Sequence, residues 1–243
     1  MIYSTKGIVL RTVKYGETSV IAGIFTEMFG IQSYIVNGVR TQGKSSKTHF
    51  FQPSSILEME VYHSELKNLQ RIKDLNWSYL YTNILSDVTK NAVALYMVEL
   101  LQKCLKQPES NLELFHFCEN AFMQLDTSDA EVTANFPLYF CLQLAHFFGF
   151  RLQNNYSKER NLFNCREGNF ANKILANDYF VEAGISYYIS QLSQALQPTD
   201  LTGIKLNKNI RRTILSALEN YYAFHISEFG VMKTLPVLHE LLG

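Results

Sequence analysis

The strongest constraint on this chain lies in its first 75 residues, where five short apolar or alternating runs follow one another. The runs cover residues 6–14, 18–27, 31–39, 54–63 and 68–75. Alternation with a period of two predicts β-strands that are buried on one face. Turn-forming residues separate or end several of the runs, namely Gly16, Gly30, Gly38 and Pro53. Five strands of this length are what an OB-type barrel requires, although an SH3-like barrel or a meander would give a similar pattern.

After Trp77 the spacing of apolar residues becomes helical. The predicted helices cover residues 84–105, 112–125, 137–148, 185–196, 209–224 and 235–242. The stretch 151–178 is polar and weakly periodic, so we expect a loop there with some extended structure. We therefore predict an α+β chain: a five-stranded OB-fold β-barrel domain at residues 1–78, followed by a mostly α-helical domain at residues 79–243 that includes an irregular region near 151–180.

Composition favours a folded protein without a strong overall charge. Of the 243 residues, 47% are hydrophobic, which is enough to bury a full core. The 22 basic and 22 acidic residues cancel, so no global field attracts the chain to nucleic acid or to an anionic membrane. The charges are unevenly distributed, because the middle of the chain is acidic whereas both ends have a small excess of basic residues.

Neither export, nor a membrane span, nor a metal site is predicted. Lys6, Arg11 and Lys14 interrupt the N-terminal segment where a secretory signal needs an apolar core. No apolar run approaches the length needed to span a bilayer. The cysteines lack CxxC spacing, which indicates neither a zinc site nor a disulfide framework; they are Cys104, Cys118, Cys141 and Cys165. We expect a cytoplasmic protein with reduced thiols, no metal and no cofactor.

The common sequence marks of catalytic sites are missing. The chain has no Walker loop, GxGxxG, GxSxG or HExxH motif. Its six histidines are scattered without the spacing that ligands of one metal ion need. We therefore expect a binding protein and not an enzyme.

The segment 38–47, GVRTQGKSSK, is the first candidate for a binding site. Arg40, Lys44 and Lys47 lie among small residues that let a phosphate backbone approach and that donate hydrogen bonds to it. In OB-type barrels, loops of this kind commonly flank a nucleic-acid groove. A flexible, solvated loop is the alternative interpretation.

Three further sets of residues extend this candidate. Arg11 and Lys14, with Lys6 before them, would lengthen the positive strip along the first predicted strand. A second basic cluster falls at helical spacing and comprises Lys205, Lys208, Arg211 and Arg212. This cluster would contact phosphate or an acidic peptide tail, or it is a solvated helix face. Aromatic residues that are candidates for base stacking, although such residues in a small barrel usually belong to the core, are Tyr15, Phe29, Tyr34, Phe50 and Phe51.

Four short motifs stand in a characteristic order within the first sixty residues. A Glu-Thr pair at residues 17–18 precedes Phe-Thr-Glu-x-x-Gly at 25–30, Gly-Val-Arg at 38–40 and Gln-Pro at 52–53. In this order they resemble the N-terminal part of the RecO family of bacterial recombination mediators. Weaker similarity in later helical stretches extends the resemblance over nearly the whole chain.

The resemblance implies a function in DNA recombination and repair. A protein of this kind would bind single- and double-stranded DNA, anneal complementary strands, and help load RecA onto DNA covered by single-stranded DNA-binding protein. The implied partners are RecR, in some bacteria RecF, and the tail of single-stranded DNA-binding protein. Arg40, Lys44 and Lys47 match the basic loop of the family, and no catalytic residue is carried over.

Two alternatives remain open at this point. The chain is instead a scaffold that docks RecR and single-stranded DNA-binding protein and has little DNA affinity of its own, or it is an OB-type RNA-binding protein. The chain also departs from the family in one respect. Many members have a four-cysteine zinc module after the central helix, whereas the corresponding stretch here contains only Cys165, so we predict no structural zinc.

Overall fold

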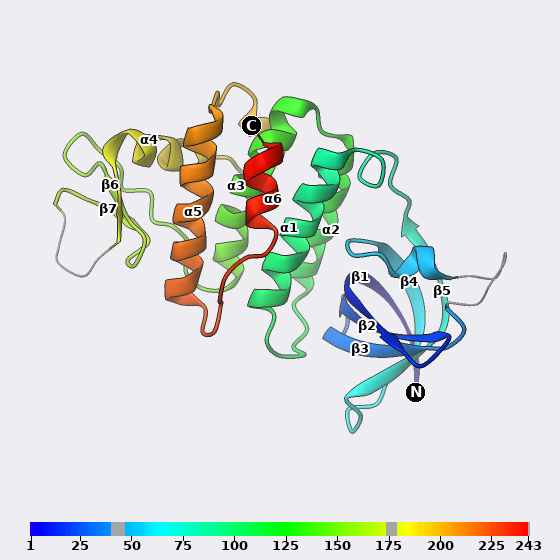
Figure 1. Cartoon of the computed structure of the whole chain (residues 1–243). Coiled ribbons are helices and arrows are strands. Elements are labelled where there is room, and N and C mark those ends of the chain that lie inside the picture. The colour runs from blue at the N-terminus through cyan, green and yellow to red at the C-terminus, as the bar shows by residue number, and fades with distance from the viewer. Residues whose placement is uncertain (40–46, 174–178, 243) are drawn as a thin grey trace. The chain divides into compact units, whose positions relative to one another are not determined.

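The computed structural model describes residues 1–39, 47–173 and 179–242 and divides into two compact units (Figure 1). The first unit combines Met1–Asn83 with Leu105–Asp126. The second combines Ile84–Cys104 with the chain from Thr127 onward. The chain therefore leaves the first unit at residue 84, returns to it for one helix, and then completes the second unit.

The first unit is built on a closed five-stranded barrel, as the sequence predicts. Its strands are β1 (Ile2–Tyr15), β2 (Ser19–Thr26), β3 (Gly30–Val36), β4 (Ile56–Tyr62) and β5 (Leu69–Tyr79). They pair in the order β1-β2-β3-β5-β4, and β4 pairs with β1 to close the ring. The β3–β5 contact is parallel and joins Ser33–Ile35 to Leu69–Arg71, whereas all other neighbours are antiparallel. A meander pairs only consecutive, antiparallel strands, so the parallel pairing of β3 with β5 excludes that alternative.

The interior of the barrel is apolar because its strands alternate between inward and outward side chains. On β4, Leu57, Met59 and Val61 are buried, whereas Glu58 and Glu60 are exposed. This alternation places Glu58 and Glu60 on the face of the strand that solvent contacts. The sequence pattern thus identifies both the strand and its inner face.

One helix, α2 (Leu112–Thr127), packs against the barrel within the first unit. The ring of Phe115 lies 5.6 Å from that of Phe25 on β2. Polar contacts surround this apolar contact: Lys6 Nζ lies 2.8 Å from Glu119 Oε1, and His116 Nε2 lies 3.1 Å from Glu27 Oε1. The side chain of Asp126 accepts hydrogen bonds from the backbone N–H groups of residues 82 and 83.

The second unit is a helical bundle with a small sheet (Figure 1). Its helices are α1 (Val88–Cys104), α3 (Ala130–Phe147), α4 (Ala183–Leu192), α5 (Lys208–His225) and α6 (Leu235–Leu241). Helices α1, α3, α5 and α6 lie side by side, and α3 is the most completely buried of them. The helical character predicted for this part of the chain is confirmed.

The start of α3 differs from the prediction, which places it at about Pro137, although proline is common in a first helical turn. The helix begins seven residues earlier, at Ala130, so Pro137 lies inside it. Asp129 provides the N-cap, since its side chain accepts a hydrogen bond of 2.9 Å from the backbone N–H of Val132. The cap and the apolar pattern that follows outweigh the proline signal.

The stretch after α3 contains extended structure, as expected. It forms a sheet of order β7-β6-β8, with β6 (Leu162–Asn164), β7 (Asn169–Ala171) and β8 (Phe180–Val181). Aromatic contacts hold it on α5, because the ring of Phe163 lies 5.5 Å from Phe170 and 5.7 Å from Tyr221. Cys165 is buried among these groups, and burial raises the pKa of its thiol to about 12.

The described residues, 1–39, 47–173 and 179–242, contain neither a candidate metal site nor a candidate membrane-spanning helix. No group of three or more His, Cys, Asp or Glu side chains in these ranges is arranged to hold a metal ion. None of the helices in the same ranges has both the length and the apolar character needed to cross a membrane.

Candidate nucleic-acid interface

A short 3-10 helix, η1 (Thr48–Phe51), packs against the barrel between β3 and β4. The hydroxyl of Thr12 on β1 donates a hydrogen bond of 2.8 Å to the carbonyl oxygen of Phe51. The hydroxyl of Thr48 and the backbone N–H of Lys47 both donate to the carbonyl oxygen of Val39, at 3.0 and 3.1 Å. These bonds fix η1 against the barrel and join the two residues that flank segment 40–46.

Three aromatic rings cluster at η1. The ring centroids of His49 and Phe50 lie 4.3 Å apart, those of Phe50 and Trp77 4.8 Å apart, and those of His49 and Trp77 6.0 Å apart. Phe50 and Trp77 are half-buried and pack against the barrel core, whereas His49 is exposed. Phe50 and Trp77 therefore hold the cluster on the barrel, and His49 presents its ring to solvent.

Exposed cations lie on the elements that hold this cluster. Lys47 immediately precedes η1, and Lys14 shares a face of β1 with Thr12, the residue that anchors η1. Arg11 is also exposed, but its side chain points to the opposite face of β1 and lies over Gly23 of β2. Within the described residues the structure gives none of these three cations an ion pair with a carboxylate. Arg40 and Lys44, which the sequence also predicts as contacts, lie outside the described residues.

We use the name η1 face for the surface formed by Lys14, Lys47, His49, Phe50 and Trp77. Its cations are suited to phosphate oxygens, and its aromatic rings are suited to the faces of unpaired bases. Phosphate contacts position a nucleic acid without reading its sequence. The arrangement therefore supports binding of single strands with little sequence preference.

The other predicted stacking aromatics have different surroundings. Tyr34 and Phe51 are buried in the barrel core, and burial raises the pKa of Tyr34. Phe29 stacks on His63 with a centroid distance of 3.9 Å, and Tyr15 is 52% exposed near the end of β1. Of the five predicted residues, Phe50 alone belongs to the η1 face.

Sequence reasoning does not identify His49 and Trp77 as part of this surface. Trp77 reaches η1 because β5 pairs with β4 in a register that places Trp77 opposite Leu57. That register includes two irregularities, between Ile56 and Leu57 and between Glu60 and Val61, which no single-sequence pattern reveals. The one available signal was the position of His49 and Phe50 directly after the basic loop.

Two members of the second basic cluster, Arg211 and Arg212 on α5, are engaged in structural contacts within the second unit. The guanidinium of Arg211 donates to Asn135 Oδ1 at 3.1 Å and to the carbonyl oxygens of Leu206 and Leu242 at 2.9 and 2.7 Å. Burial lowers the pKa of Arg211. Arg212 donates to the carbonyl oxygen of His239 at 2.7 Å. These arginines hold α6 and the residues before α5, whereas Lys205 is exposed and Lys208 half-exposed.

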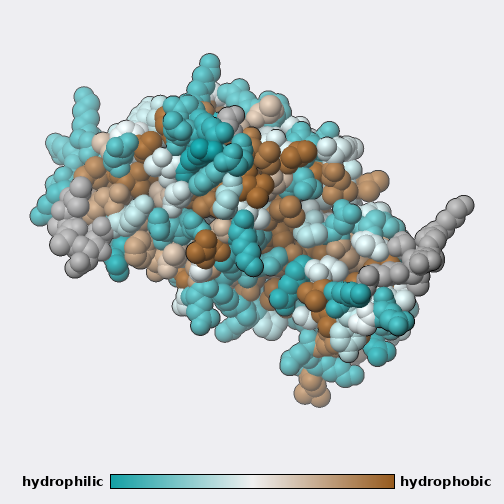
Figure 2. Space-filling view, in the orientation of Figure 1, coloured by the Kyte–Doolittle hydropathy of each residue, from teal (hydrophilic) through white to brown (hydrophobic). Residues whose placement is uncertain are grey.

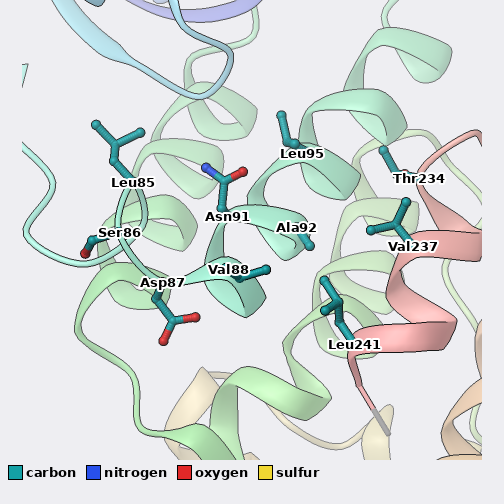
Figure 3. Close-up of a pocket in the computed structure, with 10 residues that line it drawn as sticks. All are labelled: Leu85, Ser86, Asp87, Val88, Asn91, Ala92, Leu95, Thr234, Val237 and Leu241. Carbon is teal, nitrogen blue, oxygen red and sulfur yellow. The ribbon is translucent and has the colours of Figure 1, made fainter.

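The second unit also carries an apolar groove of about 340 Å³ between α1 and α6 (Figure 3). Val88, Val237 and Leu85 are 69%, 50% and 47% exposed there, and Figure 2 shows apolar side chains gathered over the same two helices. Val237 and Leu241 point from α6 toward α1. Ten residues line the groove: Leu85, Ser86, Asp87, Val88, Asn91, Ala92, Leu95, Thr234, Val237 and Leu241.

Comparison with known proteins decides the family. The profile "Recombination protein O N terminal" matches residues 1–81, and "Recombination protein O C terminal" matches residues 85–161. A protein of Christiangramia forsetii named DNA repair protein RecO is 31% identical over the full length of both chains. This chain belongs to the RecO family.

Other RecO relatives agree over similar lengths. The DNA repair protein RecO of Flavobacterium psychrophilum is 31% identical over 98% of both chains, and that of Azobacteroides pseudotrichonymphae is 27% identical over 99% of both. The resemblance stated from the sequence motifs is thereby confirmed. The whole η1 face lies within the RecO N-terminal region, whereas the α6 side of the groove lies beyond the matched C-terminal region.

Proposed function

We propose that this RecO-family chain is a DNA-binding recombination mediator. It binds single strands on the η1 face, anneals complementary strands, and helps load RecA onto DNA covered by single-stranded DNA-binding protein. The observation that carries the proposal is the grouping of exposed cations with an aromatic cluster on a closed barrel. Its relatives are named DNA repair protein RecO, which supports a role for that grouping in DNA repair. The activity is non-covalent, so the chain acts without catalytic residues.

Annealing by a binding protein has two physical requirements. The repulsion between the two phosphate backbones must be neutralised, and the base edges must stay free to pair. Lys14, Lys47 and Arg11 meet the first requirement through exposed, loosely held contacts. Arg40 and Lys44 add to them in the proposal, because the residues that flank segment 40–46 are hydrogen-bonded to each other at η1.

The second strand has a proposed contact of its own on α5. The sequence predicts Lys208, Arg211 and Arg212 as phosphate contacts, and the proposal assigns them to the second strand. Because Arg211 and Arg212 donate to backbone carbonyls around α6, the proposal gives the larger share of DNA contact to Lys208. A second molecule bound to the complementary strand would fulfil the same role.

The groove between α1 and α6 favours a second candidate function, the docking of protein partners. The partners we propose, in the cytoplasm, are RecR, in some bacteria RecF, and the tail of single-stranded DNA-binding protein. The ten residues that line the groove include Asp87 and no lysine or arginine. An apolar partner segment therefore fits this groove better than an acidic tail does. If docking of partners is its main role, the chain is a scaffold with little DNA affinity of its own.

Equilibrium binding of a fluorescent single-stranded oligonucleotide, measured by anisotropy across a salt series, tests the proposal. Replacing Arg11, Lys14 and Lys47 together by Gln removes the two cations of the η1 face and Arg11, which lies beside it on the other face of β1. If each contacts a phosphate, the slope of log affinity against log salt falls by about 2, at roughly 0.7 per lost single-strand contact. Replacing Arg40 and Lys44 by Gln measures the contribution of the loop separately.

The matched control removes the same charge from the first part of β5 and the turn before it, with Lys67, Arg71 and Lys73 replaced by Gln. These residues are exposed, and Arg71 lies six residues, about 20 Å, along β5 from Trp77. The control should bind with an unchanged slope. Equal losses in both triple variants would show that net charge alone attracts the oligonucleotide, and a folded protein without measurable binding would favour the scaffold. Binding RNA more tightly than matched DNA would favour an RNA-binding protein.

A further inference from the structure

The three rings at η1 form a compact triangle and not a linear column. Each ring lies within 6.0 Å of both others, with interplanar angles of 33° to 36°. Phe50 and Trp77 pack on the barrel core, and the two hydroxyls that donate to Phe51 and Val39 hold the backbone on either side. The rings are therefore already positioned, and a ligand that contacts them does not need to order them.

Packing against the barrel core explains only two of the three rings. Burial against the core explains Phe50 and Trp77, because aromatic rings at the end of a small barrel exclude water from it. It does not explain His49, which is exposed and yet lies 4.3 Å from Phe50 with its ring tilted by 36°. The His49 ring extends the aromatic surface toward solvent, at a position where it does not pack on the barrel core.

The cations beside the three rings indicate which class of ligand this cluster would bind. Lys47 stands two residues before His49, and Lys14 shares a strand face with the threonine that anchors η1. A nucleotide of a single strand offers a phosphate and an aromatic base a few ångströms apart, which matches a cation beside a ring. Elsewhere on the barrel Phe29 stacks on His63, but both rings are half-buried, and His63 shares its pocket with the carboxylate of Glu65 as well as with Lys67.

We propose that His49, Phe50 and Trp77 form a stacking platform for an unpaired base, and that this platform makes the η1 face selective for single strands. The inference rests on the proposed function and adds to it the residues that distinguish single from double strands. Bases in a duplex are already stacked on their neighbours, so the platform adds affinity only for unpaired bases. Stacking on a ring is worth about 1–3 kcal/mol per base and tolerates every base, since each has a π-face.

The chain offers a direct test because Trp77 is its only tryptophan. Intrinsic emission therefore reports on the platform itself, while anisotropy of a labelled oligothymidylate reports on binding as a whole. The platform predicts that Trp77 emission is quenched in parallel with the rise in anisotropy. A duplex of the same length should change the emission little, even at concentrations where it binds.

Two variants separate stacking from other contacts. His49→Ala removes an exposed ring, so it should fold normally and should weaken single-strand binding at least about fivefold, the lower limit expected for one stacked base. Duplex affinity should stay unchanged. The control is Tyr62→Ala, because Tyr62 is 47% exposed on the same barrel but lies about 17 Å along β4 from the residue opposite Trp77. It should bind like the unaltered protein.

The outcomes distinguish this inference from the proposed function. If anisotropy rises while Trp77 emission stays constant, and His49→Ala binds like Tyr62→Ala, the platform is wrong and DNA binding stands. If His49→Ala weakens single-strand and duplex binding equally, the ring does not select unpaired bases. If the folded protein binds no oligonucleotide at all, both the platform and the proposed function fail.

Discussion

Lys6 Nζ lies 2.8 Å from Glu119 Oε1 and so joins β1 to α2 within the barrel unit. The side chain of Glu119 is only 10% exposed, whereas that of Lys6 is 41% exposed. The hydrogen bond that Lys6 donates to this carboxylate raises the pKa of Lys6. Lys6 is thus committed to holding the helix, although its place in the sequence extends the positive strip of Arg11 and Lys14.

Removing this cation should cost stability and leave DNA binding nearly unchanged. We expect Lys6→Met to lower the free energy of unfolding by about 1 kcal/mol, because Glu119 would keep a charge at a nearly buried site without its partner. Solvent around the half-exposed Lys6 limits the effect. Lys73→Met is the control, since it breaks a 2.6 Å pair with Glu60 in which both partners are exposed. Urea unfolding of the two variants should show a clear loss for Lys6→Met alone, and equal losses would contradict this account of α2 docking.

Gly30 ends the Phe-Thr-Glu-x-x-Gly motif, and the structure shows why glycine is needed there. Its φ is +61°, and an added Cβ would overlap the backbone of Glu109. We expect Gly30→Ala to lower the free energy of unfolding by about 2–4 kcal/mol, from left-handed strain together with displacement of the packed backbone.

Gly16 provides the control for this substitution, because its φ is +62° and no atom lies within 4 Å of an added Cβ. Gly16→Ala should therefore cost only the strain, about 1–2 kcal/mol. Thermal or urea unfolding of the pair measures the difference. Equal destabilisation would mean that the contact between Gly30 and Glu109 contributes nothing.

The basic residues of α5 should separate into structural and functional roles. Arg211→Gln removes charge-assisted hydrogen bonds to the carbonyls of Leu206 and Leu242 and should cost about 2–3 kcal/mol of stability. Lys208→Gln should leave unfolding unchanged and should slow annealing if Lys208 contacts the second strand. Urea unfolding and annealing rates of the two variants check this assignment. It would be contradicted by an Arg211→Gln protein that is fully stable and defective in annealing.

His239 makes the second unit sensitive to pH. Burial, with Arg212 nearby, lowers the pKa of His239 below its usual value of 6.5, and the buried Nε2 has no hydrogen-bond partner among the described residues. The folded state therefore binds fewer protons than the unfolded state near this pH. Its contribution to stability is present above about pH 6.5 and is lost as the pH falls from 6.5 through the folded pKa.

The pH effect is measured by urea unfolding of the unaltered protein and of His239→Gln at pH 7.5, 6.5 and 5.5. The decrease toward pH 5.5 should be smaller in the variant. A pKa of His239 at or above 6.5 in the folded protein, determined by NMR titration, would remove the basis of this prediction.

Short-range patterns were sufficient to predict the elements of this fold. Alternating apolar residues located all five barrel strands, and the glycines between them marked turns that the structure forms at positive φ, as at Gly16 and Gly30. The same patterns did not determine the start of α3, because one capping side chain, Asp129, outweighed the proline at residue 137. They also did not predict that α2 packs on the barrel, since the contact of Phe115 with Phe25 spans 90 residues.

The candidate site was less predictable than the fold. It depends on the register between paired strands, and on whether each basic side chain is already bonded to other groups of the protein. Charge and spacing identified Lys14 and Lys47, but Trp77 reaches the site through the irregular register between β4 and β5. Composition could not show that Arg211 donates its hydrogen bonds to backbone carbonyls, which leaves it less available to DNA. Long-range contacts of this kind are absent from local sequence patterns.

The central claim is that cations of the η1 face allow this chain to anneal DNA strands. The most direct measurement is the annealing rate of two complementary fluorescently labelled oligonucleotides, across a salt series, with the unaltered protein and two triple variants. We expect the unaltered protein and the Lys67/Arg71/Lys73→Gln control to accelerate annealing at low salt. The Arg11/Lys14/Lys47→Gln variant should give little acceleration. A folded unaltered protein that does not accelerate annealing, or an η1-face variant as fast as the control, would contradict the claim.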